Sequence, residues 1–294
     1  MAGTKVSALS AVSAIKKTDT AEFLVRTADG SRKISFASLG MSLSKAKYGE
    51  YPYDDAVELS YSWADIDAMA RANNFQDIRI GDYKTITAGG ETVRCQVAGI
   101  NTHRHCSDRD QGPHIDFISK DCLKNTVQWS SAGHNNGDAN TPYPWLASTV
   151  FTYLNETILP KLPSDLASVI VNRRALMEQR YTAGATNMTQ SNTWDWCDIG
   201  KLWLPNEVEV YGVCVWSGLN DGWAHGDGTH YPIFQGGWAT RVKGLGHNGG
   251  RCAWWLRAVH SASSTGACHV GHVGHPNGWT VTNSLAVPLC FRIA

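Results

Sequence analysis

The chain has 294 residues, and its 26 lysines and arginines are balanced by 26 aspartates and glutamates. A chain without net charge has no global field that draws it to nucleic acid or to an anionic membrane, so neither is expected as a partner. No window approaches the roughly 20 apolar residues of a membrane span, and the N-terminus lacks the apolar core of a signal peptide. The protein is therefore expected to be made in a cytoplasm, without membrane insertion.

The first predicted element is a β-hairpin near the N-terminus. Apolar and polar residues alternate over 22–27 and again over 32–36, with an Asp-Gly turn between them. A lone hairpin is only marginally stable in water, so its apolar face is expected to dock on another part of the chain or on a neighbouring subunit. The residues predicted for this docking are Phe23, Val25, Ile34 and Phe36.

The next predicted elements are a helix, a second hairpin and a strand. Ser62 to Asp65 has a capping-box pattern and begins an apolar stripe, which predicts a helix over 63–73. Strand-like runs over 83–87 and 93–97 flank two glycines and predict the hairpin. Residues 115–118 predict a further strand.

The middle of the chain is expected to contribute helices and then strands. An apolar stripe at helical spacing runs over 145–158 and is ended by Pro160. A second short helix is expected after residues 163–165. Residues 201–204 and 208–212 have the texture of strands.

The tract from Tyr211 to Ala294 is rich in glycine, tryptophan and histidine, and only Asp221 and Asp227 are acidic. Glycines allow tight turns, while indole and imidazole rings offer flat amphipathic faces at low entropic cost. This composition favours a loop-rich recognition surface over a catalytic cleft. The predicted ligand-binding residues are Trp223, His225, His230, Trp238, His247, Asn248, His260, His269, His272, His275, Asn277 and Trp279.

The tryptophans of this tract divide into two kinds. Trp254 and Trp255 are adjacent, so in a strand they point to opposite faces, and at most one is expected in the core. Trp223, Trp238 and Trp279 stand among Gly, Asn, Asp or Gln, which predicts loops.

Two histidine patterns invite a metal interpretation. His269, His272 and His275 could converge on a loop, but no carboxylate is at hand to complete a ligand set. The segment from His103 to Cys106 lies in a polar, turn-rich stretch that predicts a solvated loop. Polar loop residues are the favoured interpretation of both, so no metal or cofactor is predicted.

Catalytic motifs are weak. Gly244 to Gly249 matches G-x-G-x-x-G by letter, but a strand is expected after it rather than a helix, so dinucleotide binding is not predicted. No G-x-S-x-G elbow is present, and Glu207 and Glu209 are expected to form outward salt bridges beside a strand. The eight cysteines include no Cys-x-x-Cys pair, and most are interpreted as buried thiols. An enzyme is not predicted.

The N-terminal residues carry a first resemblance. Lys5 to Ser13, Thr18 to Thr20, Phe23 to Val25 and Arg32 to Ile34 with Leu39 resemble the short leader that opens many tailed-phage fibre and head-decoration proteins. The resemblance implies a subunit that docks on a virion through its N-terminus.

A second resemblance covers residues 62–294. The segments that carry it, in order, include Ser62-Trp63, Gly81-Asp-Tyr-Lys84, Val97-Ala-Gly-Ile100, His114-Ile-Asp-Phe117, Leu154-Asn155, Lys201-Leu-Trp-Leu-Pro205, Glu207-Val-Glu-Val-Tyr-Gly212, Trp255-Leu-Arg257 and Phe291-Arg-Ile293. They are similar to an uncharacterised domain of phage tail and bacterial surface proteins, itself similar to the C-type-lectin-like fold of formylglycine-generating enzymes. The resemblance implies a compact α+β domain whose final strand lies inside the core.

This chain departs from related patterns at two points. Ala258 follows Arg257 where the family has serine. His275-Pro276-Asn277 lacks the carboxylate of calcium-dependent lectins, which argues against calcium-mediated sugar binding. Stacking on Trp223, Trp238 or Trp279 remains as a way to hold a sugar.

The sequence therefore predicts an α+β, C-type-lectin-like domain over 62–294 with mixed or antiparallel sheets, preceded by a β docking segment over 1–41 and a connector over 42–61. The expected function is that of a tailed-phage virion protein, a tail fibre or adhesin that contacts a host-surface glycan or protein. Expected partners are other virion proteins, the host ligand and copies of itself, with a trimer as the usual fibre state. The alternatives are a capsid or tail decoration protein and an enzyme of the formylglycine-generating type.

Overall fold

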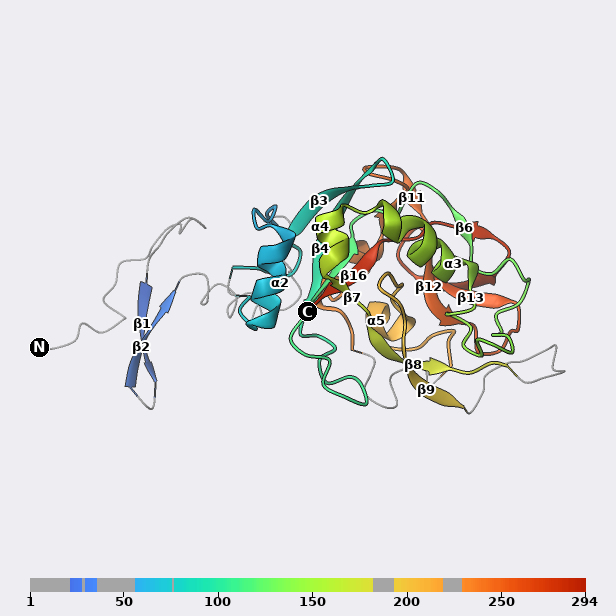
Figure 1. The fold of residues 1–294 in the computed structure, drawn as a ribbon, viewed down its shortest axis with the longest axis horizontal. Helices are drawn as coiled ribbons and strands as arrows, with labels where there is room; N and C mark the ends of the chain where they lie inside the picture. Colours follow the sequence, from blue (N-terminus) through green and yellow to red (C-terminus); the bar gives the residue numbers. More distant parts are fainter. Residues whose placement is uncertain (1–21, 28–29, 36–55, 76, 182–192, 219–228) are drawn as a thin grey trace, which may run out of the picture. The chain divides into compact units, whose positions relative to one another are not determined.

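The structure is a computed structural model that describes residues 22–27, 30–35, 56–75, 77–181, 193–218 and 229–294 (Figure 1). By internal contacts the chain forms two compact units, Met1–Glu50 and Tyr51–Ala294.

The first unit contains the predicted hairpin. Strand β1 (Glu22–Thr27) pairs antiparallel with β2 (Gly30–Ser35), and Thr27 lies opposite Gly30 at the turn. The side chains predicted to dock on a partner, those of Phe23, Val25, Ile34 and Phe36, lie outside the described part of the chain, so the docking face stays a prediction.

The second unit is built around a five-stranded antiparallel sheet. Its order is β3 (Tyr83–Ala88), β4 (Glu91–Ile100), β5 (Ile115–Ser119), β16 (Cys290–Ile293) and β7 (Ile170–Val171). Every residue of β16 is buried, and the strand lies between β5 and β7 in the sheet. Helices and antiparallel strands are mixed, which confirms the α+β class, and the last strand lies in the core as expected.

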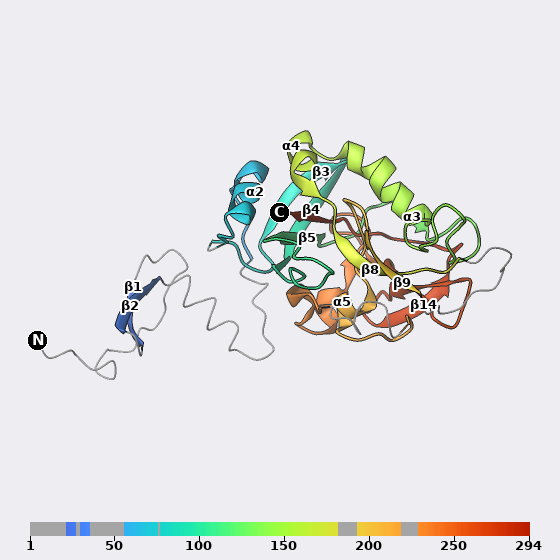
Figure 2. The ribbon, with the colours of Figure 1, turned by 60° about the horizontal axis from the view of Figure 1, so that its bottom comes forward.

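Helix α2 (Trp63–Arg71) begins where the sequence predicts. Ser62 and Asp65 form a reciprocal capping box, in which each side chain accepts a hydrogen bond from the other's backbone N–H. The helix packs through Trp63, whose ring lies 5.4 Å from that of Phe117 and 5.8 Å from that of Phe291. Helix α4 (Ser164–Val169) lies beside α2 next to the sheet (Figures 1 and 2).

The predicted helix over 145–158 starts later than expected. Ser148 caps it by accepting a hydrogen bond from Phe151 N, so helical structure runs through α3 (Thr149–Thr152), a π-helical turn η3 (Tyr153–Ile158) and a 3₁₀ turn η4 (Leu159–Lys161). Pro160 lies in this last turn, as its missing N–H allows.

Smaller sheets complete the unit. A three-stranded sheet has the order β12 (Trp254–Val259), β13 (Gly266–Val270) and β14 (Pro276–Thr280). The two-stranded pairs are β8 (Arg174–Glu178) with β9 (Trp194–Asp198), β10 (Lys243–Gly244) with β11 (Arg251–Cys252), and β6 (Val127–Gln128) with β15 (Ser284–Leu285). The 3₁₀ turns η5 (Pro232–Phe234) and η6 (Trp238–Arg241) precede β10.

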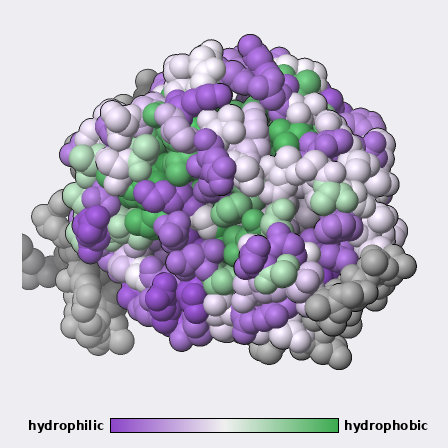
Figure 3. Space-filling view, turned by 45° about the vertical axis from the view of Figure 1, so that its right-hand side comes forward, coloured by the Kyte–Doolittle hydropathy of each residue, from purple (hydrophilic) through white to green (hydrophobic). Residues whose placement is uncertain are grey.

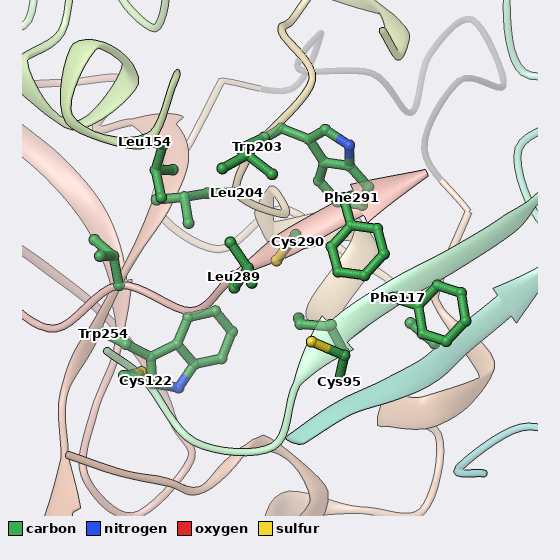
Figure 4. Close-up of a cluster of buried hydrophobic side chains, with 14 of the residues drawn as sticks. Cys95, Phe117, Cys122, Leu154, Trp203, Leu204, Trp254, Leu289, Cys290 and Phe291 are labelled. Atoms are coloured by element: carbon green, nitrogen blue, oxygen red, sulfur yellow. The ribbon is translucent and has the colours of Figure 1, made fainter. Parts of the chain in front are cut away.

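The expectation that at most one of Trp254 and Trp255 faces the core is wrong. Both side chains are fully buried, because β12 is covered on both of its faces. Trp254 stacks near Phe234, whereas Trp255 lies edge-on to His269 and donates its indole N–H to Val127 O. Figure 4 shows Trp254 beside Leu289, Cys290 and the other side chains of the main core.

Two predicted strands are also wrong. Residues 201–204 are irregular apart from a bridge between Leu202 and Phe291, and the Asn155 side chain holds Leu202 by hydrogen bonds to both its N–H and its carbonyl. Residues 207–211 form helix α5 (Glu207–Tyr211), capped by Asn206 and ended by Gly212 at φ 78°. The capping box supplies hydrogen-bond acceptors to backbone N–H groups at the start of this helix. The alternation of Val208 and Val210 with polar residues had instead indicated a strand.

Helix α5 inserts Glu209 into the centre of the molecule. Arg257 donates two hydrogen bonds to this carboxylate, at 2.7 and 3.0 Å, and Arg173 donates a third. Asn206 N supplies a fourth at 3.0 Å. Burial alone would raise the pKa of Glu209, but Arg173 and Arg257 outweigh it and hold that pKa well below its usual range. The prediction that Glu209 forms salt bridges on the outside of the molecule is thus wrong, because its ion pairs lie in the interior.

A second buried ion pair crosses the central sheet. Asp116 on β5 lies directly opposite Arg292 on β16, and Arg292 Nε and Nη2 donate to its two oxygens at 2.7 and 2.8 Å. Tyr231 Oη donates to the same carboxylate at 2.8 Å. The register of two neighbouring strands therefore sets the geometry of the pair.

His103 lies between the two carboxylates. Its Nδ1 is 3.7 Å from Asp116 Oδ2, and its Nε2 is 3.8 Å from Glu209 Oε1 and 3.1 Å from Thr229 O. The ring is fully buried, so the prediction that the segment from His103 to Cys106 is a solvated loop is wrong for His103. The buried ion network of Asp116, Glu209, Arg173, Arg257 and Arg292 with His103 and Tyr231 unites elements that are far apart in the sequence.

We predict that Glu209→Gln lowers the free energy of unfolding by about 3 to 5 kcal/mol, because it leaves two buried guanidinium groups without their counter-charge. Urea unfolding followed by tryptophan fluorescence measures the change. Glu156 is exposed on η3, and Glu156→Gln is the matched control, with an expected change below about 0.5 kcal/mol. Equal stability of the two variants would contradict the role of the network.

A second prediction concerns acid. Burial, aided by Arg173, lowers the pKa of His103 from 6.5 to about 4, although Asp116 and Glu209 oppose the shift. Between these values the unfolded chain binds a proton that the folded chain does not, so stability falls as the pH falls. The wild-type free energy of unfolding should therefore decrease between pH 7 and pH 5, and His103→Gln should remove about 2 kcal/mol of that decrease.

Unfolding by urea at both pH values tests this expectation. His105 is exposed two residues away, so His105→Gln serves as the control and should keep the wild-type pH dependence. An unchanged slope in His103→Gln would show that other groups carry the acid sensitivity.

Candidate recognition surface

Glu207 holds the loop that follows α5. One of its oxygens, Oε2, accepts hydrogen bonds from Val215 N, Trp216 N and Ser217 N, and from the Ser217 hydroxyl, all at 2.8 to 2.9 Å. The carboxylate is fully buried, so the outward position expected for Glu207 is wrong. Hydrogen bonds to an ionised group are strong, and four of them on one atom fix the backbone of the loop.

The Glu207-clamped loop, residues 212–217, presents apolar side chains to solvent. Val213 is 56% exposed, and Val215 and Trp216 are also exposed. From the other side, Ser261 N donates to Trp216 O, and the Trp216 ring lies 5.4 Å from that of His260. The sequence analysis missed these three residues. The available signal was a run of apolar side chains directly after Gly212, the residue that ends the helix.

A second exposed group lies at the tip of the β13–β14 hairpin. Gly271 and Gly274 close the turn, since Gly274 N donates to Gly271 O and Gly271 N donates to His275 O. Gly274 has φ 86°, and a Cβ there would come within 2.5 Å of Trp238 O, so only glycine fits against η6. Trp238 is 56% exposed, with Arg251 6.0 Å over its ring.

The third exposed group is on β14 itself. Trp279 lies in a strand, not in the predicted loop, and is 48% exposed. Its ring is 5.6 Å from that of His269, and His269 is paired in register with Asn277. Asn277 is exposed, whereas His269 is buried in β13, so the prediction that His269 is a loop-surface residue is wrong. Burial, with His275 nearby, lowers the pKa of His269 to about 4.

The other predicted residues fall on several parts of the surface. His230 is half-buried and bonded to Val210 O through Nε2, and His260 is half-buried beneath Trp216. Burial lowers the pKa of both rings. The exposed ones are His247, Asn248, His272 and His275. Trp223 and His225 lie outside the described residues.

Figure 3 views the molecule from the side of β12 and β13 and shows apolar side chains in several separate patches among polar ones. The contacts described above bring Trp279, Asn277, His269 and His275 together. Trp238 lies against the tip of the β13–β14 hairpin, and Trp216 lies on the Glu207-clamped loop.

The motifs weighed for other chemistry take different places. Gly244 to Gly249 forms the turn between β10 and β11, so a strand follows it, as predicted. Among residues 56–75, 77–181, 193–218 and 229–294, no three His, Cys, Asp or Glu side chains lie so that they could hold a metal ion.

The cysteines are free thiols. Cys95, Cys122, Cys268 and Cys290 are buried, and the other four are partly buried. Burial raises the pKa of Cys95 and Cys290. Cys252 differs, because a hydrogen bond with Cys122 lowers its pKa.

A very small pocket, partly open to solvent, lies between Trp145, Met177 and Arg257. Its walls are mainly apolar, and its buried cation, Arg257, is already paired with Glu209.

No helix in the described part of the chain is long and apolar enough to cross a membrane.

The described chain is thus an α+β domain with exposed aromatic side chains on braced segments. A family model described as a domain of unknown function, DUF6273, matches residues 117–294, which is more than half of the chain. The chain belongs to this family. The matched residues include Glu207 of the clamp and Glu209, Arg257 and Arg292 of the buried ion network. No curated protein and no solved structure matches the chain.

We predict that Glu207→Gln loosens the clamped loop, because an amide carries no charge and offers weaker hydrogen bonds to Val215, Trp216 and Ser217. Their amide protons should exchange at least about ten-fold faster, which corresponds to about 1.4 kcal/mol of lost local stability. Hydrogen–deuterium exchange measures the rates. The amides of β5 and β16 provide the internal reference and should keep their wild-type rates. Wild-type exchange at all three loop amides would contradict the clamp.

Proposed function

We propose that this chain is a recognition protein on the outside of a tailed-phage particle, a tail fibre or adhesin that contacts a host-surface glycan or protein. One observation carries the proposal: aromatic and aliphatic side chains stand exposed on backbone that buried groups hold rigid. Val213 and Trp216 stand on the Glu207-clamped loop, and Trp238 stands on a turn packed against Gly274. Preordered apolar groups bind with a small entropic cost, which is what a binding surface requires.

The attachment to a particle rests on the N-terminal unit and its resemblance to phage-fibre leaders. Its hairpin, β1 with β2, is too small to be stable alone, so docking on a virion protein would supply its missing core. Display in many copies, with a trimer as the proposed fibre state, would convert weak single contacts into strong attachment. In this proposal the protein acts outside the host cell.

The C-type-lectin-like fold is part of the same proposal. The α+β architecture with its last strand, β16, between β5 and β7 inside the main sheet agrees with what that fold implies. No enzymatic step is proposed, since Asp116 and Glu209 are buried and held by arginines.

Binding of the fluorescently labelled full chain to a panel of Gram-positive and Gram-negative bacteria tests the function. We expect at least one strain to bind. The double variant Val215→Asp/Trp216→Ala and the single variant Trp238→Ala should each weaken this binding about ten-fold or more. Arg71 has a 67% exposed side chain on α2, and Arg71→Ala is the control expected to bind as wild type. Sedimentation velocity follows self-association in parallel. A decoration protein would instead bind no strain and would form oligomers that Trp216→Ala dissociates. That combined result would contradict the adhesin proposal and favour a decoration protein.

A further inference from the structure

The face of β14 groups an exposed indole with an amide and two imidazoles. Asn277 and Trp279 are two residues apart in the strand, so their side chains lie on the same face. His269 pairs with Asn277 in the neighbouring strand and contacts the Trp279 ring at 5.6 Å. The His275 ring lies close to Gly271, where a Cβ would meet its Nε2 at 3.1 Å.

This β14 platform, defined as Trp279, Asn277, His269 and His275, is rigid. The Trp255 ring, fully buried, lies edge-on 5.9 Å from His269, and His269 in turn supports Trp279. The Asn277 side-chain oxygen accepts a hydrogen bond from Gly278 N at 2.8 Å. That contact fixes the amide and leaves its NH₂ group free to donate two hydrogen bonds to a ligand.

The platform contains no carboxylate, ammonium or guanidinium group. Neither β13 nor β14 contains Asp, Glu, Lys or Arg, and no acidic residue follows Asp227 in the chain. His269 is neutral at pH 7 because its pKa is about 4. A flat apolar ring flanked by neutral donors and acceptors complements a neutral molecule that has both C–H faces and hydroxyl groups.

Because β14 is an edge strand of its sheet, an extended peptide that pairs with it as an added strand is the competing ligand. Pro276 has no N–H to donate to an added strand, and Gly278 has no side chain to hold it. Both residues disfavour strand addition at this edge.

We infer that the β14 platform is a carbohydrate subsite, in which Trp279 stacks on the face of a neutral sugar ring while Asn277 and His275 hydrogen-bond its hydroxyls. The inference rests on the proposed recognition function and names its ligand class. His269 is a positioning residue, because its ring is buried and lies 5.6 Å from the indole of Trp279.

Titration calorimetry of the full chain with chitotetraose, maltotetraose and mannotetraose tests the subsite. At least one of these sugars is expected to bind, and Trp279→Ala should weaken that binding about ten-fold or more, the usual effect of losing a stacked ring. Trp279→Phe keeps a ring and should bind within about three-fold of wild type. Asn277→Ala should fall between them. Arg71→Ala is the control, since Arg71 is exposed on α2 and belongs to neither the platform nor the proposed binding surface, and it should bind as wild type.

Two results would overturn the inference: binding of none of the three sugars, or wild-type sugar affinity in Trp279→Ala. The bacterial binding assay is run on the same variants and separates the two proposals. If cells bind wild type and Trp279→Ala equally, the recognition function stands and the sugar subsite does not. If no strain binds while a sugar does, the subsite stands and the adhesin proposal fails.

Discussion

The pairing of buried carboxylates with arginines is the constraint on which this fold depends. Glu209 and Asp116 are both fully buried, and an unpaired charge in that position would cost several kcal/mol. Each is therefore viable only when the strand or helix that supplies its arginine is in place. Arg292 comes from the last strand and Arg257 from β12, so the C-terminal part of the chain must be docked before both carboxylates have these counter-charges. Buried ion pairs are weak sources of net stability, and we infer that in this protein they select one arrangement of the chain.

The same helix that places Glu209 also places Glu207, two residues earlier. One carboxylate joins the core elements, and the other binds the backbone of the exposed loop. The short helix α5 thus connects the interior to a surface that displays Trp216. A recognition surface built this way can present apolar side chains to solvent without becoming disordered, because its backbone hydrogen bonds end on an internal charge rather than on water.

Local signals predicted much of the fold. The capping box at Ser62 placed α2, and the Gly89-Gly90 turn placed the β3–β4 hairpin, since both depend on residues close in the sequence. Alternation failed at Val208 and Val210, where a capping box outweighed it. The candidate surface was predicted in part: Trp238 and Trp279 are exposed, but His269 is not. No sequence pattern reveals that Trp279 and Trp255 enclose His269, because that depends on the pairing of three strands.

By itself, the sequence determined the composition of the C-terminal tract and the α+β class of the fold. The tract is rich in indoles, imidazoles and glycines with only two acidic residues, and its turns depend on residues that are close together in the sequence. Only the tertiary structure decided which charges are internal and which rings face solvent. Asp116 and Arg292 are 176 positions apart, and their pairing follows from strand register rather than from either residue's neighbours. Burial is a property of what packs on a side chain, so Glu207, Glu209 and Trp255 could be assigned only once their partners were in place.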